Sequence, residues 1–308
     1  LDNLGRMSKE RDVRFGFVSN ANSLECRANH RFRLASYSEV RLFETVAANL
    51  DCLEAILRFA VRHGVGFFRI SSDTVPFASH PICRADWANH FADRFSAMGA
   101  YIRQHKLRIS MHPGQYTVLN APDARIRVRS IAELRYHAAL LDALGLDQTA
   151  RIQLHVGGIY GNKTQAIAAF CRQYRGLEEG LRKRLAIEND DRSYSLSDCL
   201  SIHREIGIPI IFDTFHHECL NAGESMREGL AAAEESWSAK DGALMVDYSS
   251  QQSGRRPGTH ADTLDERHFL GFLNEAEGSD CDVMLELRDK DVSALKAISL
   301  ARRHGLSE

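Results

Sequence analysis

The chain has 308 residues, of which 44% are hydrophobic and 26% are charged, and its formal net charge is −2. This composition is typical of a soluble globular protein, and the charge argues against a strongly basic, obligate nucleic-acid binder. No apolar run approaches the ~20 residues of a membrane-spanning helix, so we expect no membrane association. The seven cysteines lack CxxC spacing, and no export signal is visible. We therefore expect reduced thiols and a cytoplasmic location.

Residues 1–12 are polar and charged, without the apolar core of a secretory signal. They predict a flexible N-terminal tail, followed by a single domain over residues 13–308. No internal repeat, low-complexity tract or Pro/Gly/Ser-rich linker divides the chain. A chain of this length commonly forms one domain when it folds as an α/β barrel.

Short apolar runs rich in β-formers alternate with longer stretches of helical periodicity along the whole chain. In the first helical stretch, residues 39–63, apolar residues recur at spacings of three and four. In chain order the prediction is strand 13–18, helix 39–63, strand 65–70, helix 87–105, strand 107–111, helix 126–144, strand 150–156, helix 163–182, strand 184–187, helix 196–206, strand 209–212, helix 225–238, strand 243–246, helix 265–276, strand 282–287 and helix 292–303.

Eight strands that are each followed by a helix predict an α/β fold of the (β/α)₈ or TIM-barrel type. The alternative is a doubly wound open sheet. Such a sheet ordinarily has fewer strands, and its first turn often carries a Gly-rich phosphate-binding fingerprint. No such fingerprint follows Val18, so the sequence favours the barrel.

A barrel places its active site at the C-terminal ends of its strands. Six consecutive strands, from the third to the eighth, carry His, Asp or Glu at that end. Any one of them alone would be an ordinary polar residue, but a cluster of strongly hydrated side chains at one end indicates a function. The cluster consists of His112, His155, Glu188, Asp213, His216, Asp247, His260 and Glu286.

Imidazole together with carboxylate is a typical ligand set for Zn²⁺, Mn²⁺ or Fe²⁺. Eight candidate ligands exceed the needs of one ion, so we expect two or three divalent ions. Mn²⁺ is the first choice, with Mg²⁺, Zn²⁺ or Co²⁺ as alternatives. Ions clustered ~3.5–4 Å apart commonly cleave phosphodiesters. The other histidines fall mostly on helices or helix ends and are expected to face solvent or satisfied neighbours, whereas His80 remains a site candidate because it follows the second strand.

Six motifs occur in order along the strands, and they cover nearly the whole chain. They are Pro-Phe-Ala-Ser-His-Pro (76–81), Ser-Met-His-Pro-Gly-Gln-Tyr (110–116), Leu-His-Val-Gly-Gly (154–158), Ile-Glu-Asn-Asp (187–190), Phe-Asp-Thr-Phe-His-His (212–217) and Arg-Pro-Gly-Thr-His-Ala (256–261). The ordered set resembles that of the UV damage endonucleases. That family is a TIM barrel related to apurinic endonucleases of the endonuclease IV type, and it nicks DNA immediately 5′ of UV photoproducts and some other lesions, leaving a 3′-hydroxyl.

The resemblance also implies residue roles. All the candidate ligands named above except Asp247 fall on family metal positions, and Gln115 and Tyr116 fall on the pair that probes the damaged duplex. Tyr can fill the gap left by an extruded base, and Gln can bond to base edges or backbone. We take Glu188, His80 and Lys290 as catalytic candidates. Further candidates for contact with DNA or the lesion are Phe17, Asn20 and Arg256.

Two positions depart from the pattern of some relatives. Strand seven can carry Lys-x-His, where this chain has Met245 and Asp247. Asp can still bind a metal, so Asp247 stays in the expected ligand set, whereas any role of the lysine is lost or moved. The first strand can carry Tyr where this chain has Phe17, whose ring can stack on a base but cannot donate a hydrogen bond.

The leading hypothesis is a metal-dependent endonuclease that nicks damaged double-stranded DNA 5′ of lesions, acting as a monomer without an obligate protein partner. The alternatives are an apurinic-site endonuclease or a sugar isomerase on the same barrel, and a barrel that only binds DNA or stores metal. The His-rich ligand set and the pair Gln115–Tyr116 disfavour an isomerase. We expect basic residues of the mouth loops to neutralise DNA phosphates; these are Arg27, Arg31, Arg33, Arg125 and Arg256.

Overall fold

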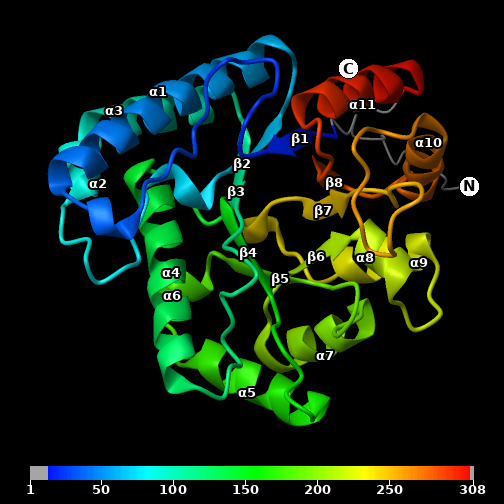
Figure 1. The fold of residues 1–308 in the computed structure, drawn as a ribbon. Coiled ribbons are helices and arrows are strands. Elements are labelled where there is room, and N and C mark those ends of the chain that lie inside the picture. Colours follow the sequence, from blue (N-terminus) through cyan, green and yellow to red (C-terminus); the bar gives the residue numbers. More distant parts are fainter. Residues whose placement is uncertain (1–12, 306–308) are drawn as a thin grey trace, which may run out of the picture.

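Eight parallel strands close into a barrel in sequence order, with helices around it (Figure 1). The structure is a computed structural model that describes residues 13–305, so the predicted tail lies outside the described residues. The strands are β1 Phe15–Val18, β2 Phe67–Ile70, β3 Arg108–Met111, β4 Arg151–His155, β5 Leu185–Glu188, β6 Ile210–Asp213, β7 Leu244–Tyr248 and β8 Cys281–Leu285. The predicted (β/α)₈ barrel is confirmed.

The helices match the predicted stretches with three differences. They are α1 Glu39–Arg62, α2 Trp87–His90, α3 Ala92–Gln104, α4 Ala124–Ala143, α5 Lys163–Arg175, α6 Glu179–Arg182, α7 Leu196–Ile206, α8 Thr214–Cys219, α9 Met226–Glu234, α10 Glu266–Glu275 and α11 Asp291–Arg303, with 3-10 turns η1 Leu34–Ser36, η2 Ser72–Thr74 and η3 Ala239–Asp241. The stretches 87–105 and 163–182 are each split into two helices, and α8 occupies a segment that was predicted as loop. In residues 13–305, no helix combines the length and the hydrophobicity that a membrane crossing needs.

The barrel interior has an apolar layer made of Phe67, Ala186, Ile211, Met245 and Met284. Toward the N-terminal ends of the strands lies a charged layer, in which Arg108 Nη1 is 3.2 Å from Asp282 Oδ2. Met245 pairs in register with Asp282 and Asp247 with Met284, so Met245 lies one step below Asp247 on the same side of β7. The apolar layer therefore separates the mouth from the lower ion pairs.

Phe17 faces the helices rather than the mouth. Successive residues of a strand point to opposite faces, and Phe17 is 0% exposed, with its ring against Phe59 of α1 and Phe68 of β2. A base cannot reach this ring, so the expectation that Phe17 contacts the lesion is wrong.

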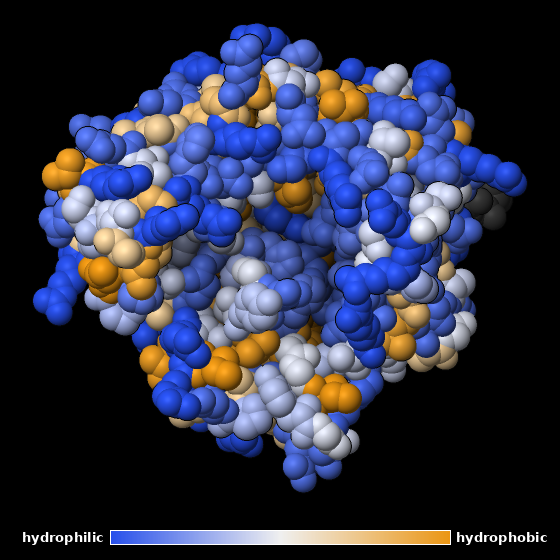
Figure 2. Space-filling model, in the orientation of Figure 1, coloured by the Kyte–Doolittle hydropathy of each residue, from blue (hydrophilic) through white to orange (hydrophobic). Residues whose placement is uncertain are grey.

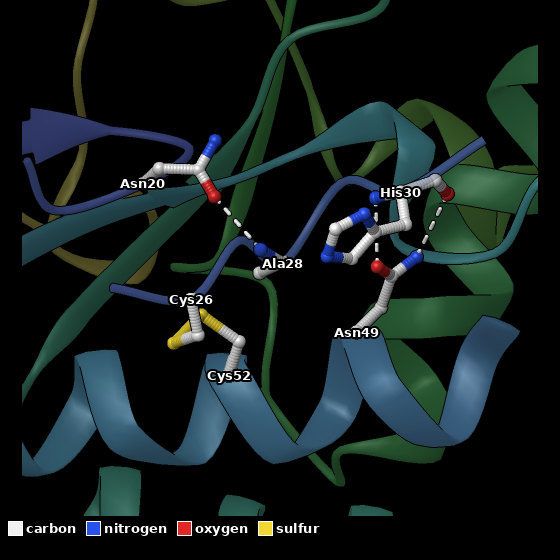
Figure 3. Close-up of a disulfide and its surroundings, with 6 residues drawn as sticks. All are labelled: Asn20, Cys26, Ala28, His30, Asn49 and Cys52. Carbon is white, nitrogen blue, oxygen red and sulfur yellow. Dashed lines mark hydrogen bonds between the residues drawn. A yellow bond between two sulfur atoms is a disulfide. The ribbon is translucent and has the colours of Figure 1, made fainter. Parts of the chain in front are cut away.

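A disulfide joins Cys26, in the loop after β1, to Cys52 of α1 (Figure 3). The expectation of reduced thiols is therefore wrong for this pair, because 26 residues of separation carry no spacing signal and only the fold brings the two thiols together. Asn20 belongs to the same loop, where its Oδ1 accepts a 2.7 Å hydrogen bond from the Ala28 amide. Since Asn20 is 1% exposed, it shapes the loop, and the expectation that it contacts DNA is also wrong.

Candidate metal centre

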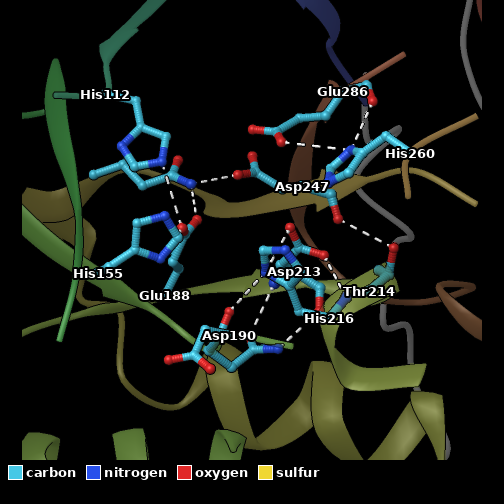
Figure 4. Close-up of polar contacts among 12 residues, drawn as sticks. His112, His155, Glu188, Asp190, Asp213, Thr214, His216, Asp247, His260 and Glu286 are labelled. Carbon is cyan, nitrogen blue, oxygen red and sulfur yellow. Dashed lines mark hydrogen bonds and ion pairs between the residues drawn. The ribbon is translucent and has the colours of Figure 1, made fainter. Parts of the chain in front are cut away.

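The mouth of the barrel is a hydrophilic hollow in the middle of the face that Figure 2 shows. Residues at the C-terminal ends of β3 to β8 converge there (Figure 4). Two groups of potential ligand atoms each lie within 4.8 Å of one another, namely His112, His155 and Glu188, and Glu188, Asp213 and Asp247. Glu188 belongs to both groups, so its carboxylate is placed to join two ion positions.

Glu188 ends β5 and is 1% exposed. Its Oε1 lies 2.6 Å from His155 Nδ1 and 3.4 Å from His112 Nε2. Burial by itself raises the pKa of Glu188, but the two imidazoles outweigh it and hold the pKa well below its usual value. Burial likewise lowers the pKa of His155, and the attraction of Glu188 more than reverses this. Glu188 is therefore ionised, as a metal ligand must be.

His216 and His260 each present one nitrogen to the centre. The Nδ1 of His216 lies 3.0 Å from the Asn189 carbonyl oxygen, and the Nδ1 of His260 lies 3.0 Å from the Glu286 carbonyl oxygen. A carbonyl only accepts, so both Nδ1 atoms donate, and Nε2 is the nitrogen that each ring can offer to a metal once it carries no proton. The two ring centroids are 5.9 Å apart.

The short helix α8 positions Asp213 together with His216. Asp213 caps the helix, because its Oδ1 accepts a 2.8 Å hydrogen bond from the His216 amide. Burial raises the pKa of Asp213 to about 6, although His216 opposes the rise. Burial lowers the pKa of His216, but Asp213 and other carboxylates overcome this and raise it to about 9. A buried carboxylate next to an imidazole is a suitable pair for a divalent cation.

Two central residues, Arg69 of β2 and Gln153 of β4, were absent from the predicted site. Arg69 is 4% exposed, and its guanidinium pairs with Asp247 at 2.6 Å and with Glu286. Gln153 donates hydrogen bonds to Glu188 and Asp247. Strand alternation could have found Arg69, since it stands two residues after the inward-facing Phe67.

A buried histidine of α4 supports the strand that carries His112. Burial lowers the pKa of His137 to about 4. The neutral ring donates from Nδ1 to the Glu133 carbonyl at 2.8 Å, and its Nε2 lies 2.9 Å from the Ser72 hydroxyl oxygen. That hydroxyl oxygen is 2.8 Å from the His112 carbonyl oxygen, so His137 belongs to the structural support of the centre.

The predicted probe pair lies in the loop between β3 and α4. Tyr116 is 84% exposed and Gln115 is also exposed. The Thr117 amide donates to the Gly114 carbonyl at 2.9 Å, which closes a turn beneath the pair. The two side chains are therefore exposed in the loop that follows His112.

The remaining predicted residues lie in the mouth loops. Arg256 is exposed in the loop after β7. His80 is exposed after η2, where its Nδ1 accepts from the Ile82 amide at 3.1 Å. Lys290 directly precedes α11 with a φ of 55°, and burial followed by the charge of Arg27 lowers its pKa. The roles of these three residues stay predictions.

A β/α barrel with a shared carboxylate between two ligand groups defines an enzyme with a candidate multi-ion metal centre. The family model described as UV-endonuclease UvdE matches residues 13–306. The chain belongs to this family, and membership makes it a DNA repair endonuclease.

Individual relatives agree with the family model. The UV DNA damage endonuclease of Clostridium perfringens is 36% identical over 289 residues, which cover 93% of this chain and 70% of the relative. That of Bacillus cereus is 32% identical and covers 93% of both chains. The crystal structure of SacUVDE superposes with a TM-score of 0.91 at 42% identity, covering 95% of this chain and 99% of the other. Endonuclease IV from Thermus thermophilus, at 16% identity over 82% of this chain and 93% of its own, has a TM-score of 0.55 and shares the fold.

Proposed function

We propose that this enzyme nicks double-stranded DNA immediately 5′ of UV photoproducts and other lesions, with two or three divalent ions, Mn²⁺ foremost, at the mouth of the barrel. The observation that carries the proposal is the pair of ligand groups sharing Glu188, beside an aromatic side chain that is 84% exposed. The UV-damaged substrate is inferred from the relatives, which are named UV DNA damage endonucleases.

The residues of the centre fit divalent ions. His112 Nδ1 is buried and makes no hydrogen bond among the described residues, and the buried Glu188 Oε1 faces the imidazoles of His155 and His112. A buried polar atom without a hydrogen bond is costly, and a cation held by these imidazoles and the carboxylate would remove that cost. Imidazole and carboxylate are both ligands for Mn²⁺ or Zn²⁺.

When bound, such ions would polarise the phosphoryl oxygen and activate the attacking water. The protein residues would hold the reacting groups in place. Glu188 would fix the distance between the two ion positions, while His216 and His260, each with Nδ1 held by a carbonyl, would orient the second half of the centre. We assign Lys290 to neutralising the scissile phosphate and retain His80 as a candidate proton donor for the leaving oxygen.

A groove of about 470 Å³ supports contact with a DNA strand. It lies between the loops after β3 and β4 and the helix α5, and Arg127, Tyr160 and Arg172 are among its lining residues. None of the described residues that line it is a carboxylate. Arginines with an aromatic ring form a surface that suits a phosphate backbone and its bases.

The proposal is tested by nicking of supercoiled plasmid, with irradiated and unirradiated DNA, each with and without a chelator. We expect relaxation only of irradiated plasmid and only with divalent ions present. Equal nicking of both plasmids, or nicking that survives exhaustive chelation, would contradict it. A plasmid carrying only apurinic sites separates this function from that of an apurinic endonuclease.

A further inference from the structure

The centre contains a cationic side chain of the protein itself, that of Arg69. The guanidinium of Arg69 reaches from β2 between β4, β7 and β8, and the whole side chain is buried. Its Nη2 donates to Asp247 Oδ1 at 2.6 Å and to Gln153 Oε1 at 2.7 Å, and its Nη1 donates to Glu286 Oε1. An arginine cannot lose its proton in a protein, so this charge is permanent.

Asp247 and Asp213 differ in what holds their oxygens, although they are register partners on adjacent strands. Both Asp247 oxygens accept from protein side chains, Oδ1 from Arg69 and Oδ2 from Gln153. Within residues 13–305, Asp213 has no such side-chain amide or guanidinium donor; its Oδ1 caps α8 and its Oδ2 lies 3.1 Å from Nδ1 of His216. Asp247 is therefore the ion-pair partner of Arg69, whereas Asp213 keeps one oxygen with which it can bind a metal ion.

The balance of charges in the centre also favours two divalent ions. Four carboxylates meet there, those of Glu188, Asp213, Asp247 and Glu286. When all four are ionised, Arg69 leaves three negative charges. Two divalent ions would turn this into a single positive charge, which matches the single negative charge of a phosphodiester. A third ion would leave an excess of three positive charges in the centre.

A third ion would also have few ligands. His216 and His260 could supply two nitrogens, but both oxygens of Asp247 and the Oε1 of Glu286 accept hydrogen bonds from Arg69 or Gln153, which leaves Glu286 Oε2. Turning Asp247 toward an ion would take a partner from a buried guanidinium, which is strongly unfavourable.

We propose that Arg69 acts as a built-in cation that removes Asp247 from the ligand set and limits the centre to two divalent ions. This inference rests on the metal centre of the proposed function, and it narrows the two or three expected ions to two. Asp247 is then a positioning residue for Arg69, and through it for Glu286.

The test counts Mn²⁺ per chain by elemental analysis after equilibrium dialysis, which needs no activity assay. The matched pair of variants is Asp247→Asn and Asp213→Asn, the same chemical change at register partners. We expect about two ions for the parent enzyme and for Asp247→Asn, and a loss of about one ion for Asp213→Asn, because only Asp213 is a ligand. Circular dichroism of each variant confirms that it is folded.

A second variant, Arg69→Met, keeps the test decisive if Asp247→Asn does not fold. Removing the guanidinium frees the oxygens of Asp247 and Glu286, so the count should rise above that of the parent enzyme at saturating Mn²⁺. The inference is wrong if the parent enzyme binds three ions, if the two Asp→Asn variants lose ions equally, or if folded Arg69→Met binds as many ions as the parent. None of these results would contradict the nuclease function. A parent enzyme that binds no divalent ion and does not nick irradiated DNA would instead contradict the proposed function itself.

Discussion

Glu188 is the residue on which both ligand groups depend. Its carboxylate is buried at the end of β5, and it lies within reach of two imidazoles and two aspartates. A carboxylate can serve two ions because it has two oxygens with about four lone-pair positions. Substitution at this position should therefore affect both halves of the centre.

Glu188→Gln should lower the nicking rate at least ~100-fold, because metal ions contribute several kcal/mol to the stabilisation of transition-state charge. The amide keeps the size of the side chain but loses the charge that holds two ions. Single-turnover nicking of irradiated DNA measures the effect. Glu178→Gln, which changes a surface partner of Arg135, is the control and should retain the parent rate. Parent-like activity in Glu188→Gln would remove Glu188 from the site.

His137 predicts a dependence of stability on pH. Burial lowers its pKa to about 4, whereas an unfolded histidine titrates near ~6.5. As the pH falls below ~6.5, the unfolded state takes up a proton that the folded state does not, so stability is lost down to a pH of about 4. The shift corresponds to about 3 kcal/mol. Urea unfolding of chelated protein between pH 7 and 4.5 should show a shallower dependence in His137→Gln than in the parent, and identical slopes would refute this.

At the residue scale the sequence predicted which candidate ligands converge but not the residues that support them. His112, Glu188 and Asp213 could be found because strand ends share one edge of a barrel. Arg69 could not be found by that rule, since it lies inside a strand and its role depends on partners from β7 and β8. The misassignment of Phe17 has the same origin, because side-chain direction depends on the register of β1 against β2.

The loop between β3 and α4 joins the candidate ligand His112 and the predicted probe pair in one segment. His112 faces Glu188, and four residues later Tyr116 is 84% exposed. A Cβ added at Gly114 would meet no heavy atom within 4 Å, so the turn before the pair is open to solvent. Such a probe enters where stacking is already weak, as it is at a photoproduct.

Tyr116→Ala should reduce the ratio of the affinities for damaged and intact duplex by about tenfold or more, since stacking on an aromatic ring contributes about 1–3 kcal/mol. Metal content should stay at the parent value. Fluorescence anisotropy with lesion-bearing and undamaged duplexes at one salt concentration measures the ratio. Tyr116→Phe, which keeps the ring, should discriminate as the parent does. If the ratio for Tyr116→Ala is unchanged, the probe assignment is wrong.

Helices could be predicted from the sequence where their apolar periodicity extends over several turns. The helix α1 spans 24 residues and shows several turns of apolar spacing. The helix α8 has six residues, fewer than two turns, and depends on its cap Asp213. The break between α2 and α3 at Phe91 was also not predictable, because no Gly or Pro marks it in the sequence.

On the scale of the whole molecule, a net charge of −2 has to be reconciled with a polyanionic substrate. Arg31 and Arg125 already face carboxylates, Asp73 at 3.7 Å and Asp123 at 2.9 Å. Arg256 is exposed in a mouth loop. Local positive charge on one face can bind DNA while the average stays acidic.

Log affinity for DNA should fall linearly with log salt, with a slope of about 0.9 per contacted phosphate. Arg256→Gln should reduce that slope by about one such unit and weaken binding to damaged and intact DNA alike. Arg58→Gln, on α1 and paired with Glu54, is the control and should leave the slope unchanged. An affinity that does not vary with salt would contradict this reading of the mouth loops.

The central claim is tested most directly with an end-labelled duplex that carries one UV photoproduct, incubated with the parent enzyme, with chelated enzyme and with chelated enzyme to which Mn²⁺ is restored. We expect one nick immediately 5′ of the photoproduct that leaves a 3′-hydroxyl, no nick after chelation, and recovery with Mn²⁺. Circular dichroism should show that the chelated barrel stays folded, because its apolar interior layer and outer core contain no metal ligand. A nick elsewhere, cleavage of undamaged duplex at the same rate, or full activity without divalent ions would contradict the account.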